Sequence, residues 1–189
     1  MREQIGIEKS RLTNGEIYFI QIPYEEIELM LHWYKPEFFQ LKEAYYHNEY
    51  LVAKVKFSEY PFIRGNMPFV SSNLINLAID QCALVHIGMM IKYNFIKLLI
   101  KENDILKYMS FEEYNRIVGD EFVTAKIEAQ YLKPISPLKE IQVISHFNNL
   151  KRNIKGRYLF RFSLKCEEYF NIQAIFAYPL NLDLIDNIE

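Results

Sequence analysis

The feature that most constrains this chain is its longest apolar-rich stretch, which runs from Leu74 to Ile91. Four polar residues interrupt it: Asn76, Asp80, Gln81 and His86. Each of these side chains would be costly inside a lipid bilayer, so we expect no membrane span here. A stretch that is apolar on nearly every face of a helix is typical of a helix enclosed by other structure. We therefore predict a buried helix from about Ser72 to at least Met90.

The segments on either side of this helix have the patterns of strands. Before it, alternating apolar and polar residues predict strands at Phe39–Tyr46 and Tyr50–Ser58, and three-and-four spacing predicts a helix at Tyr24–Tyr34. After it comes a connecting region, Lys92–Glu113. Four strand candidates follow: Ile117–Leu132, Glu140–Asn149, Tyr158–Glu167 and Phe170–Tyr178. An antiparallel sheet wrapped around one long central helix fits this order, which is the α+β arrangement of the hot-dog fold.

Length and composition set further limits. A chain of 189 residues fits one domain, whose first 35 residues or so form an extension carrying the first helix. The formal net charge of −2 gives none of the basic face expected for nucleic-acid binding. Cys82 and Cys166 form no Cys-x-x-Cys pair and the four histidines are scattered, so we expect no metal site and a reduced, cytoplasmic setting. The first residues lead into no long apolar run, so no signal peptide is expected.

Three groups of residues resemble a known family. The segment Ser110–Tyr114 has the pattern Ser-x-acid-acid-Tyr, and Lys133–Pro137 has the pattern Lys-Pro-x-x-Pro. The second group is Phe62-Ile63-Arg64, followed by Phe69 and then by the pair Asp80-Gln81. The third is Tyr34, at the end of the first predicted helix. In order and spacing these residues resemble the FcoT-type hot-dog proteins, usually described as long-chain acyl-CoA thioesterases. The resemblance runs from about Leu29 to Leu180.

The chain departs from that family at two positions. Phe62 stands where the family has a tyrosine, which removes a hydroxyl from the expected substrate site. Asp80 stands where the family has an asparagine, which replaces a neutral amide by a potential base. The resemblance implies a substrate carried on coenzyme A or on the phosphopantetheine of an acyl carrier protein, with no separate cofactor.

Hydrolysis of a thioester requires a group that stabilises the oxyanion and a group that activates water. We expect backbone amides at the start of the central helix, over Phe69, Val70, Ser71, Ser72 and Asn73, to serve the first purpose. We expect Asp80 to serve the second, because a carboxylate within an apolar helix has a raised pKa. Gln81 or Asn76 would orient the water or the thioester carbonyl.

Each candidate residue also has a structural interpretation. Asp80 could sit hydrogen-bonded at a dimer interface, and Asn73 and Asn76 could satisfy nearby backbone groups. Tyr34 is favoured as a core residue, while Arg64 could bind a phosphate of coenzyme A or pair with Glu59. The remaining residues are expected to be structural: Ser71 and Ser72 as helix caps, His86 and Cys82 in the core, and Lys133 in a solvated turn.

Two other functions remain open at this point. The first is a lyase on the same fold, either dehydratase-like or adding glycine to an enoyl carrier-protein thioester, with Asp80 as the base and Arg64 on the glycine carboxylate. The second is a non-catalytic module that binds acyl chains or acts as a scaffold, which the missing hydroxyl at Phe62 favours. By analogy with the fold, we expect a homodimer or a larger homo-oligomer.

Overall fold

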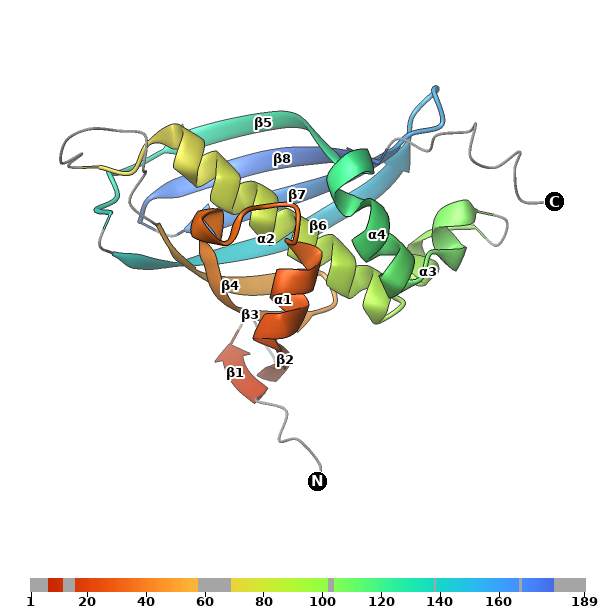
Figure 1. Ribbon diagram of the computed structural model, residues 1–189, viewed down its shortest axis with the longest axis horizontal. Helices are drawn as coiled ribbons and strands as arrows, with labels where there is room; N and C mark the ends of the chain where they lie inside the picture. The colour runs from red at the N-terminus through yellow and green to blue at the C-terminus, as the bar shows by residue number, and fades with distance from the viewer. Residues whose placement is uncertain are drawn as a thin grey trace.

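The computed structural model describes residues 7–11, 16–57, 69–101, 104–137, 139–166 and 168–178. Eight antiparallel strands form one curved sheet, and the long helix α2 lies along its inner face (Figure 1). The strand order across the sheet is β1-β2-β3-β4-β6-β7-β8-β5. This is the predicted hot-dog fold.

The elements have the following bounds. The strands are β1 (Ile7–Arg11), β2 (Glu16–Ile22), β3 (Leu41–His47), β4 (Tyr50–Lys56), β5 (Val123–Tyr131), β6 (Glu140–Arg152), β7 (Tyr158–Cys166) and β8 (Phe170–Tyr178). The α-helices are α1 (Tyr24–Met30), α2 (Ser72–Lys92), α3 (Phe95–Leu99) and α4 (Phe111–Glu121), and the short 3-10 helices are η1 (Pro36–Phe38) and η2 (Ile105–Tyr108).

Helix α2 forms the centre of the core. Its 21 residues give it a length of about 30 Å. In the described part of the chain it is the one helix with the length and hydropathy of a membrane span, but 83% of its apolar window is buried inside the molecule. The burial comes from β3, β4 and β6 on one side and from α1 and α4 on the other. α2 is therefore the core helix of the fold, as the sequence predicts.

The strands that face α2 alternate between buried and more exposed side chains. On β7, Tyr158, Phe160, Phe162 and Leu164 are buried against the core, and the residues between them are less buried. The rings of Phe162 and Phe176 of β8 pack edge to face with centroids 6.0 Å apart. Alternation of this kind is what the two-residue repeat of a strand imposes on a sheet with one buried face.

Close packing fixes α1 and α4 against the C-terminal half of α2. The hydroxyl of Tyr114 on α4 donates to the carbonyl of Leu84 on α2 at 2.6 Å. Gly88 permits this approach, because a Cβ there would lie 2.4 Å from Met30 Sδ and 2.8 Å from Tyr114 Cε1. A side chain at position 88 would push the helices apart.

The structure corrects four of the predicted elements. Ile117–Glu121 belongs to helix α4, so the strand predicted from Ile117 begins only at Val123. The predicted connecting region contains α3, η2 and the start of α4. The first helix ends at Met30 and is followed by turns, which place Tyr34 outside it. The N-terminal extension also contributes strands β1 and β2 to the sheet.

Candidate functional site

The most informative polar group on α2 is the carboxylate of Asp80. Its side chain is half-buried, and Oδ1 accepts a hydrogen bond from Thr124 Oγ1 of β5 at 2.8 Å. Burial raises the pKa of Asp80 to about 6, while the Thr124 hydroxyl acts in the opposite direction. A carboxylate with a pKa near 6 is ionised at neutral pH and still basic enough to accept a proton from water.

Tyr34 lies within electrostatic range of this carboxylate. Burial raises the pKa of the Tyr34 phenol well above its ordinary value, and the negative charge of Asp80 raises it further. The phenol is therefore neutral at physiological pH and able to donate a hydrogen bond. Tyr34 is half-buried and packs against the core, so the predicted core role is confirmed. A role in the site stays a prediction.

Asn76 lies one helical turn before Asp80 on the same face of α2, about 6 Å away along the axis. Its Oδ1 faces the hydroxyl of Tyr131 of β5 at 3.4 Å, which is long for such a bond. Asn73, one further turn along, is exposed. This polar face of α2 therefore meets strand β5 at two points, through Asp80 with Thr124 and through Asn76 with Tyr131.

Gln81 has a different environment from its neighbour. Its side chain is fully buried, and Oε1 accepts hydrogen bonds from the backbone amides of Gln40 at 2.9 Å and Leu41 at 3.3 Å. Its Nε2 donates to the carbonyl of Phe38 at 2.8 Å. The Gln81 amide thus holds residues 38–41, which join η1 to β3, against α2. Tyr34 lies a few residues earlier in the same connection. These contacts favour a positioning role over the predicted direct contact with water or thioester.

The start of α2 is capped as the sequence predicts. Ser71 is the N-cap, and its Oγ accepts from the amide of Leu74 at 3.4 Å. The expected set of free amides is smaller than predicted, because the Val70 amide donates to the carbonyl of Ile135 at 2.9 Å. The amides of Ser72 and Asn73, in the first turn, have no acceptor within the helix. Ser72 is eight residues from Asp80, or about 12 Å along the axis, so within one chain these amides and Asp80 do not reach the same carbonyl.

A pocket of about 330 Å³ lies beside the start of α2. Predicted substrate-binding residues line one wall: Phe69, Val70 and Ser72, together with Ile75. The end of β5 and the Lys-Pro-x-x-Pro segment line the other: Tyr131, Leu132, Lys133, Pro134 and Ile135. Two motifs that are far apart in the sequence therefore form one mostly apolar pocket, and Tyr131 connects it to Asn76. Phe62 and Arg64, also predicted to bind substrate, lie outside the described residues.

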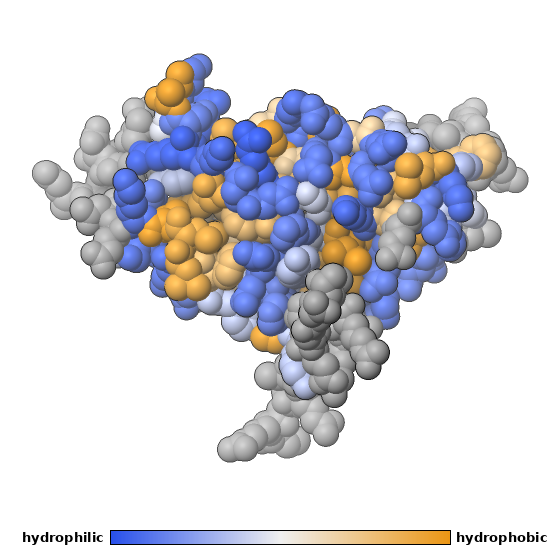
Figure 2. All heavy atoms as spheres, turned by 180° about the vertical axis from the view of Figure 1, so that it is seen from behind, coloured by the Kyte–Doolittle hydropathy of each residue, from blue (hydrophilic) through white to orange (hydrophobic). Residues whose placement is uncertain are grey.

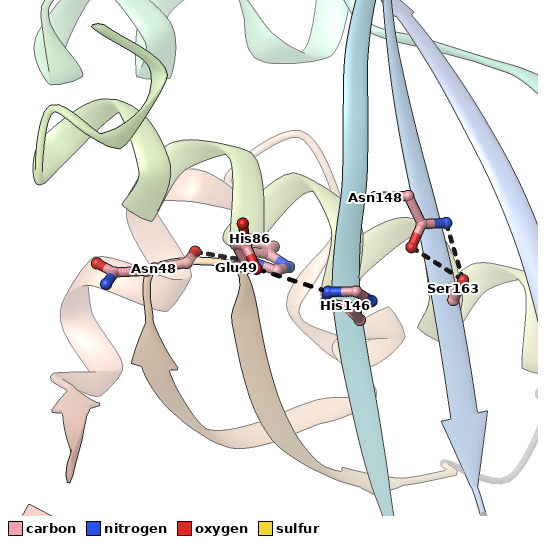
Figure 3. A network of polar contacts seen from close by, with 6 residues as sticks. All are labelled: Asn48, Glu49, His86, His146, Asn148 and Ser163. Atoms are coloured by element: carbon pink, nitrogen blue, oxygen red, sulfur yellow. Dashed lines mark hydrogen bonds and ion pairs between the residues drawn. The ribbon is translucent and has the colours of Figure 1, made fainter. Parts of the chain in front are cut away.

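His86 is a satisfied core residue, as predicted, and belongs to the network in Figure 3. Its Nε2 faces the carbonyl of Asn48 at 3.3 Å, and its Nδ1 lies 3.0 Å from Ser145 Oγ. Because a carbonyl only accepts, Nε2 carries the proton and Nδ1 accepts from the serine. Burial lowers the pKa of His86 to about 3, so the ring is neutral. Its neighbour His146 faces Glu49 at 3.8 Å nearer the surface.

Sequence reasoning missed two residues of this site, Thr124 and Tyr131. Both lie in the strand predicted from Ile117, but their proximity to α2 depends on β5 pairing with β8 at the edge of the sheet. In the described part of the chain, no group of three or more His, Cys, Asp or Glu side chains could hold a metal ion.

Comparison with protein-family models and with curated proteins gives no match. Among solved structures, a thioesterase superfamily protein from Shewanella loihica is 16% identical with a TM-score of 0.39, covering 75% of this chain and 93% of that one. A hypothetical thioesterase protein with coenzyme A from Streptococcus pneumoniae is 10% identical with a TM-score of 0.41, covering 70% and 80%. A sigma28-regulated virulence protein from Campylobacter jejuni is 8% identical with a TM-score of 0.47, covering 83% and 92%. Values this low carry no information on activity.

Proposed function

We propose that the chain is an acyl thioester hydrolase in which Asp80 activates water. The proposal rests on the position of Asp80, a half-buried carboxylate on the core helix that is hydrogen-bonded to Thr124. Asn76 lies one turn away and contacts Tyr131, which lines the pocket. Buried carboxylates without a cationic partner are costly, and such a group is more readily understood as functional than as structural.

In the proposed reaction, Asp80 accepts a proton from a water molecule as the water oxygen attacks the thioester carbonyl. The new C–O bond gives a tetrahedral intermediate with a negative oxygen. When that intermediate collapses, the C–S bond breaks and the thiolate leaves with the proton held by Asp80. The products are a carboxylic acid and a free thiol, and Asp80 returns to its ionised state.

Asn76, by its position on the helix, and Tyr34, by its charge interaction with Asp80, are the candidate donors to the negative oxygen. Asn76 lies within one turn of Asp80, and because its Oδ1 faces Tyr131, its Nδ2 is directed elsewhere. The Asp80 charge helps to keep the Tyr34 phenol neutral, so the phenol O–H can donate a hydrogen bond. The more distant amides of Ser72 and Asn73 are better placed for the pantetheine or phosphate part of a substrate in the pocket, beside Lys133.

The resemblance to FcoT-type proteins supports coenzyme A or an acyl carrier protein as the thiol part of the substrate. The fold supports a homodimer as the working unit. Among the described residues, strand β5 is the edge of the sheet, and eight of its nine residues are exposed, so its backbone is available to a second copy.

The test is release of free thiol from medium and long acyl-CoA and acyl carrier-protein thioesters, saturated and 2-enoyl. We expect turnover by the natural chain and a loss of about 100- to 10,000-fold in Asp80→Asn. Asp120→Asn, at an exposed aspartate of α4, is the matched control and should remain active. Loss of enoyl substrate that depends on added glycine and releases no thiol would instead establish the lyase. Bound acyl chains without turnover would establish a binding module.

A further inference from the structure

One end of the molecule combines exposed apolar side chains with a concentration of basic ones. It is formed by the β6–β7 hairpin tip, residues 151–157, and by residues 93–101 and 104–108, which include α3 and η2. We call this surface the hairpin end. In Figure 1 the hairpin tip and α3 both lie at the right of the molecule, away from the start of α2.

Large apolar side chains at the hairpin end are unusually exposed. Ile154 at the hairpin tip is fully exposed, Leu98 is 80% exposed and Tyr108 is 71% exposed. Leu99 and Tyr93 are exposed beside them. Figure 2 shows the same end on its left, with one apolar group at the hairpin tip and a larger one over α3 and η2, separated by hydrophilic residues. Clustered exposed apolar side chains mark interaction surfaces.

The charge of this surface is opposite to that of the whole chain. Its basic residues are Lys97, Lys101, Lys107, Lys151, Arg152, Lys155 and Arg157. Among the described residues, none of them forms an ion pair with a carboxylate. The one acidic residue in these segments, Asp104, accepts hydrogen bonds from the Tyr158 hydroxyl and the Leu106 amide. The formal net charge of the chain is −2, so the excess of positive charge is local.

The two parts of the hairpin end are fixed to each other. The hydrogen bond from Tyr158 of β7 to Asp104 joins the base of the hairpin to η2. The rings of Phe95 on α3 and Phe147 on β6 pack edge to face with centroids 6.3 Å apart. The apolar and basic groups are therefore presented together on one rigid frame, and no further folding is needed to bring them to a partner.

We propose that the hairpin end binds the surface of an anionic lipid membrane. The lysines and arginines lie at the level of the lipid phosphates, and Ile154, Leu98 and Tyr108 enter the boundary between headgroups and acyl chains. A nucleic acid would match the charge but not the exposed aliphatic side chains. An acyl carrier protein would need to dock near the pocket, and α3 lies at the opposite end of α2, about 30 Å away. This proposal does not depend on the chemistry assigned to Asp80.

The test is co-sedimentation of the full chain with vesicles of phosphatidylcholine alone or mixed with phosphatidylserine, at low and at high salt. We expect binding only to the anionic vesicles, weakened by salt. Replacing Lys97 and Lys155 by Gln should reduce the partition coefficient about 25-fold, at about fivefold for each charge. Replacing Ile154 and Leu98 by Ser should reduce it at least about tenfold.

Matched controls lie elsewhere on the surface. Lys165→Gln on β7 and Leu29→Ser on α1 replace exposed residues of the same types and should bind vesicles like the natural chain. All the substituted positions are exposed, and urea unfolding is to be used to check that each variant is folded. Absence of binding to anionic vesicles, or equal binding by the hairpin-end and control variants, would overturn the proposal. The proposal would also be overturned if vesicles are not bound and the hairpin-end variants instead lose binding to an acidic carrier protein or lose self-association.

Discussion

The environment of Asp80 leads to a prediction about stability that holds whatever the substrate is. In the folded chain the pKa of Asp80 is about 6, against an ordinary 3.8, chiefly because the carboxylate is desolvated. Ionising it therefore costs more in the folded than in the unfolded state. The change Asp80→Asn removes the charge and keeps an oxygen that can accept the hydrogen bond from Thr124. We expect this variant to be more stable than the natural chain at neutral pH.

The magnitude follows from linkage between protonation and folding. A folded pKa that is higher than the unfolded one stabilises the protein at low pH, and this stability is lost as the pH rises from about 4 through about 6. Above that range the difference between the two pKa values corresponds to about 3 kcal/mol in the free energy of unfolding. Asp80→Asn should therefore gain up to about 3 kcal/mol at pH 8, but only about 0.5 kcal/mol at pH 4, where the acid is neutral in the folded state and about half ionised in the unfolded state.

Urea unfolding of the two proteins at a series of pH values measures this difference directly. Comparing the proteins at each pH cancels the contribution of His86, whose lowered pKa destabilises both in acid. Asp120→Asn, the exposed control, should differ from the natural chain by no more than about 0.5 kcal/mol across the range. Equal stability of Asp80→Asn and the natural chain at pH 8 would refute the argument that a desolvated, ionised carboxylate is held in this site.

Three further changes test the packing around α2. Gln81→Met keeps the volume but removes three hydrogen bonds to buried backbone, so urea unfolding should show a loss of about 2–4 kcal/mol, against less than about 1.5 for the core control Leu84→Met. Gly88→Ala places a methyl group 2.4 Å from Met30 Sδ and should cost about 1–3 kcal/mol, part of which Met30→Ala should restore. The protein loses stability as the pH falls below 6.5 because the buried His86 must then take up a proton. His86→Gln cannot titrate, so its thermal stability should rise relative to that of the natural chain, compared at each pH, as the pH falls from 6.5 to 4.

Much of the fold could be predicted because it depends on local patterns. A stretch that is apolar on every face has few alternatives to a buried helix, and α2 begins where Ser71 can cap it. Helix α4 was missed although Ser110 and Glu113 form the first and last residues of a capping-box pattern, and Ser110 does cap the Glu113 amide. The β-branched residues Ile117 and Val118 favour a strand instead, so the local signals conflict at this point.

The site was only partly predictable for a different reason. Asp80 could be named from the sequence because a carboxylate within an apolar helix is unusual by itself. Its partner Thr124 could not be named, because β5 follows α4 in the chain but pairs with β8, the last strand in the amino-acid sequence. Whether two side chains meet across such a connection depends on long-range strand order, which spacing along the chain does not encode. The buried contacts of Gln81 depend on the path of residues 38–41 in the same way.

The enclosure of α2 limits how a protein of this kind can change its substrate during evolution. Substitutions on the buried faces of the helix disturb its packing against the sheet and against α1 and α4, so we expect the helix that carries Asn76, Asp80 and Gln81 to vary little. Strand β5 and the Lys133–Pro134 turn have no such restriction, because most of their side chains are exposed. Under the proposed function, differences in acyl chain or carrier should therefore accumulate on the pocket wall formed by the end of β5 and the Lys133–Pro134 turn, while the helix stays unchanged.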